Sequence, residues 1–169
     1  QEATELAALF PNNQLYLHNN ATKDKLSKVN SSIVHLATHG HLHPTDVNES
    51  YLLMAGGKLT TGDIYGLKLD GVDLVTLSAC QTALADKPTS AEIPSLAQAF
   101  SVAGSHSLIA SLWSVEDEAT RRLMLEFYKQ LLAGNSRAES LRTAQISMIR
   151  SGSSHPFLWA AFQLIGGWR

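Results

Sequence analysis

The chain has 169 residues, of which 44% are apolar and 17% are charged, and its formal net charge is −2. This length and composition suit the buried core of one globular domain, and the spread-out charges lack the basic patch typical of nucleic-acid or membrane-surface binders. No apolar run approaches the about 18 residues of a membrane span, and no signal peptide is recognisable, so we expect a cytoplasmic protein. Because the chain begins at Gln1 rather than Met, we expect one domain over residues 1–169 that belongs to a longer protein.

The amino-terminal third predicts three small elements from its apolar spacing and its capping residues. They are a helix over Glu2–Phe10, a short strand at Gln14–His18 and a helix over Thr22–Lys28.

Three later runs are apolar on both faces, as the buried strands of a parallel sheet are. They are Ile33–Thr38, Leu74–Ala79 and Ser107–Trp113. Between the first two, Gly56 and Gly57 separate Leu52–Ala55 from Lys58–Thr60, and this pair permits the positive φ angles of a tight turn. These residues predict an inserted β-hairpin.

Two helices are predicted around the third run. Pro94–Ala103 opens with proline at a first helical position and stops at Gly104, so it connects two parallel strands as a βαβ crossover. The next helix has Ser114 as its predicted N-cap, acidic residues in its first turn and Gly134 at its end.

A further helix begins with the capping box of Ser136 and Glu139 and ends before Gly152. The last two helices each carry an apolar face toward the core: Ala119, Leu123, Phe127 and Leu131 on one, Leu141, Ala144, Met148 and Ile149 on the other. The chain closes with Phe157–Ile165, which predicts a helical turn and an edge strand.

The candidate chemistry lies where two of the predicted strands end. His39 follows the first strand and Cys80, the single cysteine, follows the second, and ligands gather beyond the carboxyl ends of parallel strands. A thiolate attacks carbonyl groups, and a nearby imidazole can remove the thiol proton and then protonate the leaving amine. Gly40 can present its backbone N–H to a substrate oxygen, and with the N–H of Cys80 it would form an oxyanion hole.

Five motifs in this order resemble the CHAT domain, a caspase-like family of peptidase clan CD that is often fused to TPR repeats in bacteria. They are HLATHGH (35–41), LSACQT (77–82), SLAQAF with AG (95–104), SLIASLWSVEDEAT (107–120) and HPFLWAAF (155–162). The resemblance implies a caspase-like three-layer α/β sandwich, with a mostly parallel sheet, helices on both faces and an inserted β-hairpin. It also implies a cysteine endopeptidase with His39 and Cys80 as its catalytic dyad, a protein or peptide substrate, TPR repeats as partners and no cofactor.

Two departures from the family pattern leave a second function open. The family has additional strands before the helix at Glu2, and its loop after the cysteine is rich in glycine, whereas residues 83–96 contain none. The alternative is an inactive caspase-like module that regulates or scaffolds in association with TPR repeats.

Acidic residues near the third strand end offer a substrate pocket for lysine or arginine. Its candidate residues are Asp63, Trp113, Ser114 and Asp117, with Glu116 beside them. The competing interpretation is that acids in the first turn of a helix serve the helix dipole.

The histidines His35, His39, His41 and His43 raise a third possibility, a zinc hydrolase. In the zinc-binding sequence run that they approach, His43 takes the place of an aspartate and Pro44 that of the last histidine, and only His106 and His155 remain downstream. Strand alternation also directs His35 away from the others. Phosphate-binding glycine-rich loops are absent from the sequence, so no metal or organic cofactor is expected.

Overall fold

The computed structural model describes residues 1–43, 46, 49–78, 81–82, 92–152 and 155–169. Its main sheet has the strand order β1-β5-β7-β8. The strands are Ile33–Leu36 (β1), Leu74–Leu77 (β5), Ser107–Ser111 (β7) and Phe162–Gly166 (β8). The first three are parallel and β8 is antiparallel to β7, which confirms the predicted parallel sheet and its edge strand.

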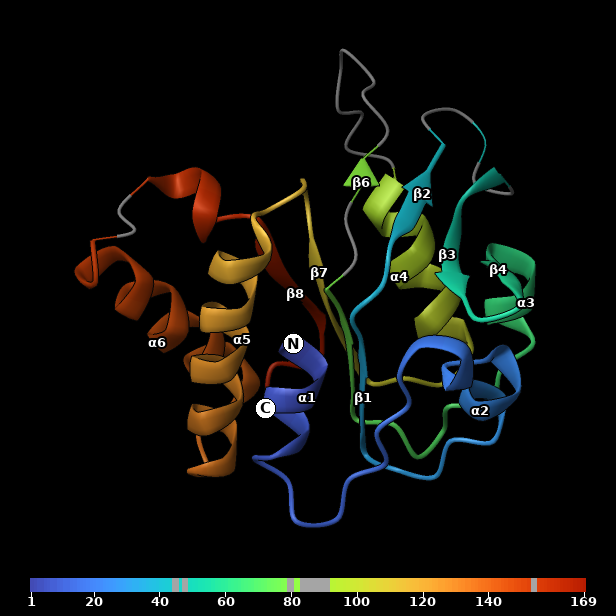
Figure 1. The fold of residues 1–169 in the computed structure, drawn as a ribbon, viewed down its shortest axis with the longest axis horizontal. Coiled ribbons are helices and arrows are strands. Elements are labelled where there is room, and N and C mark those ends of the chain that lie inside the picture. Colours follow the sequence, from blue (N-terminus) through green and yellow to red (C-terminus); the bar gives the residue numbers. More distant parts are fainter. Residues whose placement is uncertain (44–45, 47–48, 79–80, 83–91, 153–154) are drawn as a thin grey trace.

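Helices cover both faces of this sheet (Figure 1). One side carries α1 (Glu2–Ala7), α5 (Asp117–Leu132) and α6 (Arg137–Arg150), and the other α2 (Lys23–Ser27), α3 (Thr61–Tyr65) and α4 (Glu92–Val102). An apolar cluster lies on each side, with Phe127 in one and Phe100 in the other. The α/β sandwich is therefore confirmed. Of the helices described, none is long and apolar enough to cross a membrane.

A second sheet has the order β4-β3-β2-β6 and continues beyond the ends of β1 and β5. Its strands are Gly40–Leu42 (β2), Tyr51–Met54 (β3), Gly57–Thr60 (β4) and Gln81–Thr82 (β6). The predicted hairpin is β3 and β4, which pair antiparallel. We did not predict β2 and β6, because strands of two or three residues are too short to show a period.

The hairpin turn lies one residue earlier than predicted. Met54 pairs with Gly57, so the two turn residues are Ala55 and Gly56 rather than Gly56 and Gly57. Gly56 has a φ of 84°, a conformation that a residue without a side chain adopts at no steric cost. Gly57, with a φ of 145°, is already the first residue of β4.

The predicted strand at Gln14–His18 is wrong. Residues 14–17 form no regular element, and His18 begins a short 3-10 helix, His18–Asn20. Their apolar side chains are exposed, Leu15 by 40% and Tyr16 by 37%, because no described strand lies alongside to pair with them. The helix before them is also shorter than predicted and ends at Ala7 instead of Phe10.

Three helix details also differ from prediction. Helix α5 begins at Asp117 with Glu116 in the N-cap position, so Ser114 lies outside it and is not the cap. Helix α4 begins at Glu92, two residues before Pro94. On α6, Ile149 is 40% exposed, because Leu141, Ala144 and Met148 form the face that packs. The remaining helix, η3, is the predicted closing turn, Pro156–Leu158.

Candidate active site

His39 lies between β1 and β2, just beyond the carboxyl end of β1. Two hydrogen bonds to Leu53 of β3 hold this stretch of backbone: the Leu53 N–H donates to the His39 carbonyl at 2.8 Å, and the Thr38 hydroxyl donates to the Leu53 carbonyl. The His39 residue is exposed. The hairpin therefore fixes the main chain of His39 and leaves the residue accessible to a substrate.

Cys80 lies outside the described residues, but its chain neighbours are described on both sides. The Ser78 N–H donates to the Leu36 carbonyl at 3.0 Å, and Gln81 pairs with His41 in the parallel ladder of β2 and β6. Ser78, two residues before Cys80, is thus bonded to a residue three before His39, and Gln81, one residue after Cys80, pairs with a residue two after His39.

The hydrogen-bond alternation of β2 sets the direction of the Gly40 N–H. The His39 carbonyl is bonded to Leu53, and Gly40 is opposite Leu52, the next position of the antiparallel ladder. Positions in such a ladder alternate between bonded and non-bonded pairs, so Gly40 and Leu52 form a non-bonded pair. The Gly40 N–H consequently points away from β3, toward the side of β2 on which β6 lies.

Asp63, a candidate pocket residue, closes a capping box at the start of α3. Its carboxylate accepts hydrogen bonds from the Thr60 N–H at 2.8 Å, the Thr60 hydroxyl at 2.9 Å and the Lys23 ammonium at 2.7 Å. These donors, Lys23 first, lower the pKa of Asp63 from 3.8 to about 2. We did not predict α3, although Thr60 and Asp63 have the spacing of a capping box.

Replacing Asp63 with Asn is expected to remove a stability increment that depends on pH. A carboxyl whose pKa is lower in the folded state stabilises the fold above its unfolded pKa, and that contribution is lost as the pH falls from about 4 to about 2. Because Asp63 and Lys23 are 39% and 41% exposed, solvent screening limits the effect at pH 7 to about 1 kcal/mol. Urea unfolding at pH values from 7 to 2 measures the free energy of unfolding of both proteins, and the two values should converge as the pH falls.

Asp24→Asn is the matched control for this prediction. Asp24 forms a more exposed ion pair with Lys28, and its loss should change the free energy of unfolding by less than about 0.5 kcal/mol. If the difference in free energy of unfolding between Asp63→Asn and wild type stayed constant down to pH 2, the stabilising role of the ionised Asp63 carboxylate would be contradicted.

The other candidate pocket residues follow β7, the neighbour of β5. Trp113 stacks on Phe157, with ring centroids 5.8 Å apart, and its indole N–H donates to the Phe157 carbonyl at 2.8 Å. Asp117 is the exposed first residue of α5, and Ser114 is partly buried in the connection before it. These residues share the carboxyl edge of the main sheet with His39, whereas Asp63 lies at the far edge of the second sheet.

Of the histidines in the zinc hypothesis, the rings of His41 and His43 are neighbours, with centroids 6.4 Å apart, whereas His35 has partners elsewhere. Both ring nitrogens of His35 are bonded, to the Tyr128 hydroxyl at 3.1 Å and to the Glu2 carboxylate at 2.9 Å. His41 stacks on Tyr51, with centroids 5.2 Å apart. Within the described ranges, no three His, Cys, Asp or Glu side chains are grouped so that they could hold a metal ion. Sequence reasoning missed Glu2 and Tyr128 as partners of His35.

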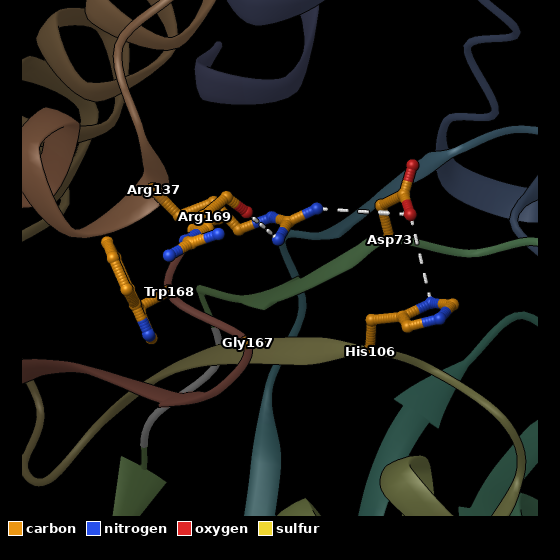
Figure 2. A pocket seen from close by; sticks show the side chains of 6 residues that line it. All are labelled: Asp73, His106, Arg137, Gly167, Trp168 and Arg169. Carbon is orange, nitrogen blue, oxygen red and sulfur yellow. Dashed lines mark hydrogen bonds and ion pairs between the residues drawn. The ribbon is translucent and has the colours of Figure 1, made fainter.

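A cavity lies at the opposite edge of the main sheet. Its volume is about 280 Å³, and Asp73, His106, Arg137 and Trp168 are among its lining residues (Figure 2). Asp73 directly precedes β5 and His106 directly precedes β7, so the cavity is at the amino ends of the parallel strands. It is therefore separate from the edge that carries His39.

Comparisons with known proteins identify a family whose model matches this chain and relatives that are similar to it. The family model of the CHAT domain matches residues 1–167. Tetratricopeptide repeat protein 28 of Mus musculus and of Homo sapiens are each 36% identical to this chain over 110 residues. These segments cover 64% of this chain but only 4% of each relative. The match of nearly the whole chain to the family model shows that it belongs to the CHAT domain family.

Proposed function

We propose that this chain is a caspase-like cysteine endopeptidase that hydrolyses protein substrates with a dyad of His39 and Cys80. The observation that carries the proposal is the hydrogen bond from the Ser78 N–H to the Leu36 carbonyl together with the pairing of Gln81 with His41. Ser78 and Gln81, the described residues on either side of Cys80 in the sequence, are therefore both held beside the segment that carries His39. Membership of the CHAT family supports the same pair of residues.

In the proposed reaction, His39 takes the proton of the Cys80 thiol, and the thiolate sulfur attacks the carbonyl carbon of the scissile peptide bond. The carbon–nitrogen bond breaks as the imidazolium of His39 gives its proton to the leaving amine, and a thioester remains. His39 then deprotonates a water molecule, which attacks the thioester and releases the carboxylic acid and the thiol. This sequence needs no metal or organic cofactor.

Backbone N–H groups would stabilise the oxyanion of each tetrahedral intermediate. The proposed donors are the N–H groups of Gly40 and Cys80. The direction of the Gly40 N–H, away from β3 and toward the side of β6, supports its part in this role.

The relatives suggest the setting in which the domain works. They are named for tetratricopeptide repeats, and the matched segment is 4% of their length. We propose that the chain is one domain of a longer protein and works in association with TPR repeats, which would present protein substrates to it. We also propose that the peptidase prefers lysine or arginine at the cleavage position, because the acidic side chain of Asp117 would attract a basic residue of the substrate.

The dyad is tested by the pH dependence of thiol alkylation at Cys80. In the full-length protein, iodoacetamide labelling read on the Cys80 peptide by mass spectrometry should rise with a midpoint below that of a free cysteine, about pH 8.5. His39→Ala should return the midpoint to that of free cysteine and lower peptide hydrolysis by about 10²- to 10⁴-fold.

His41→Ala is the matched control, because His41 lies two residues further along and stacks on Tyr51. It should keep the wild-type midpoint and the wild-type rate of hydrolysis. A wild-type midpoint equal to that of free cysteine, or one that His39→Ala leaves unchanged, would count against the dyad.

A further inference from the structure

A partly buried carboxylate on α1 joins two strands of the main sheet. One oxygen of Glu2 accepts a hydrogen bond from His35 of β1 at 2.9 Å, and the other accepts one from the Ser78 hydroxyl at 3.1 Å. The side chains of Glu2 and His35 are only 16% and 13% exposed. An ionised carboxylate only accepts hydrogen bonds, so the His35 nitrogen and the Ser78 hydroxyl are the donors.

The same network continues into the core beneath the sheet. The second ring nitrogen of His35 is 3.1 Å from the Tyr128 hydroxyl, which is 2.8 Å from the hydroxyl of Thr76 on β5. Tyr128 and Thr76 are both buried. Burial raises the pKa of Tyr128 above its ordinary value, so its hydroxyl keeps its proton and remains a donor.

Ser78, two residues before Cys80 in the sequence, is held by hydrogen bonds from two sides. Its N–H is bonded to Leu36 of β1, and its hydroxyl is bonded to Glu2, so main chain and side chain are both held. Ser78 is two residues before Cys80, and Gln81, one residue after Cys80, pairs with His41. Ser78, the last described residue before Cys80, is therefore anchored by a contact that comes from α1.

We propose that Glu2 is a positioning residue for Cys80, acting through its hydrogen bonds to Ser78 and His35, which fix the carboxyl end of β5 relative to β1. The proposal rests on the function proposed above, because it assigns to Glu2 the alignment of the Cys80 thiol with His39. The reaction itself makes no use of Glu2, His35 or Ser78.

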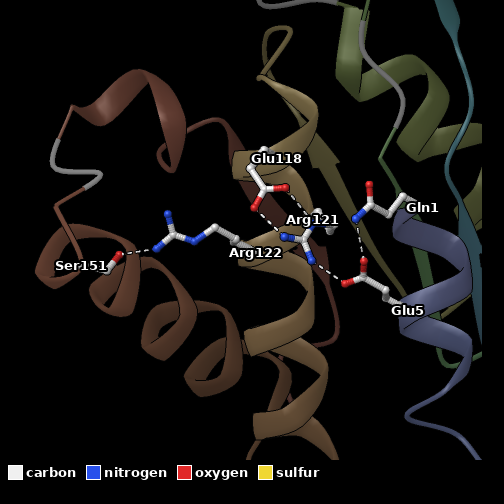
Figure 3. A network of polar contacts seen from close by, with 6 residues as sticks. All are labelled: Gln1, Glu5, Glu118, Arg121, Arg122 and Ser151. Carbon is white, nitrogen blue, oxygen red and sulfur yellow. Dashed lines mark hydrogen bonds and ion pairs between the residues drawn. The ribbon is translucent and has the colours of Figure 1, made fainter.

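The competing explanation is that Glu2 only attaches α1 to the rest of the domain. Glu5 on the same helix already does this through its ion pair with Arg121 of α5, which also binds Glu118 (Figure 3). Glu5 makes no contact with Ser78 among those described, so Glu5→Gln weakens the attachment of α1 and spares the Glu2–Ser78 bond. It is the matched control.

The experiment measures the pH midpoint of Cys80 alkylation and the kcat and KM of peptide hydrolysis in the full-length protein. Glu2→Gln and Ser78→Ala should each raise the midpoint by about one pH unit, which slows alkylation about tenfold below it, and should lower kcat with KM unchanged. Removing the negative charge of Glu2 would by itself favour the thiolate and lower the midpoint. A rise therefore reports lost alignment, and Ser78→Ala tests it with no change of charge.

Wild-type midpoints in both variants would overturn the positioning role, and so would an equal rise in Glu5→Gln. If Glu2→Gln does not fold, Ser78→Ala decides the question alone. If the alkylation midpoint of the wild-type protein equals that of a free cysteine, the dyad is contradicted, and the positioning proposal with it. If the wild-type midpoint is lower than that of a free cysteine and both variants keep it, only the positioning proposal is contradicted.

Discussion

Cys80→Ser is expected to lower the hydrolysis of a peptide substrate by about 10⁴-fold or more in the full-length protein. Serine has nearly the same shape, but its hydroxyl is far less acidic than a thiol, and His39 alone does not make it an effective nucleophile. The remaining rate would come from substrate binding and the oxyanion donors, which the substitution leaves in place. Cleavage is measured on a peptide library varied at the cleavage position, which also tests the proposed preference for lysine and arginine.

The same experiment separates the three candidate functions. Cys80→Ser should unfold at the wild-type temperature, so that a loss of activity is not a loss of fold. Cleavage that survives the substitution and disappears with a chelator would favour the zinc hydrolase. A folded wild-type protein that cleaves no substrate, and whose Cys80 is alkylated with the pH midpoint of a free cysteine, would favour the inactive scaffold module.

The central strands were predictable because each is buried on both faces. Leu74 belongs to one apolar cluster and Val75 to the other, so adjacent residues of β5 are both buried and the run is continuously apolar. Such a run, followed by a crossover helix, defines a parallel sheet almost by itself. The position of His39 at a strand end follows from the same pattern.

Local patterns failed where a partner element decides the outcome. The alternation at Gln14–His18 resembles a strand, but no described strand pairs with it, and an extended segment without a partner forms no ladder. Conversely, β6 exists only because β2 lies beside it.

The hydrogen bonds of Glu2 could not be predicted from the sequence either, because they also depend on elements that are distant along the chain. Strand alternation correctly directs His35 away from the other histidines, and a buried imidazole requires hydrogen-bond partners. Those partners, Glu2 and Tyr128, are 33 and 93 residues away in the sequence, and no local spacing connects them. The packing of α1 and α5 against β1 brings them together (Figure 1).

Phe127→Ala is expected to lower the free energy of unfolding by about 3 to 5 kcal/mol, which is a large part of the stability of a typical domain. Phe127 is 0% exposed in the apolar cluster on the α5 side of the sheet. Its ring packs edge to face against that of Tyr128, with the ring centroids 4.9 Å apart. Alanine leaves a cavity that the surrounding side chains fill only in part. Leucine at the same position keeps most of the volume and should cost less than half as much.

Urea unfolding measures this loss, and Leu132→Ala on the same helix is its control, because Leu132 is 51% exposed and should cost less than about 1 kcal/mol. Phe127 contributes packing and Glu2 contributes alignment, so their variants should differ in kind. Phe127→Ala, studied below its unfolding temperature, should keep the wild-type midpoint of Cys80 alkylation, whereas Glu2→Gln should raise it with a smaller loss of stability. A raised midpoint in Phe127→Ala would mean that packing beneath the sheet, and not the Glu2 contact alone, aligns the thiol.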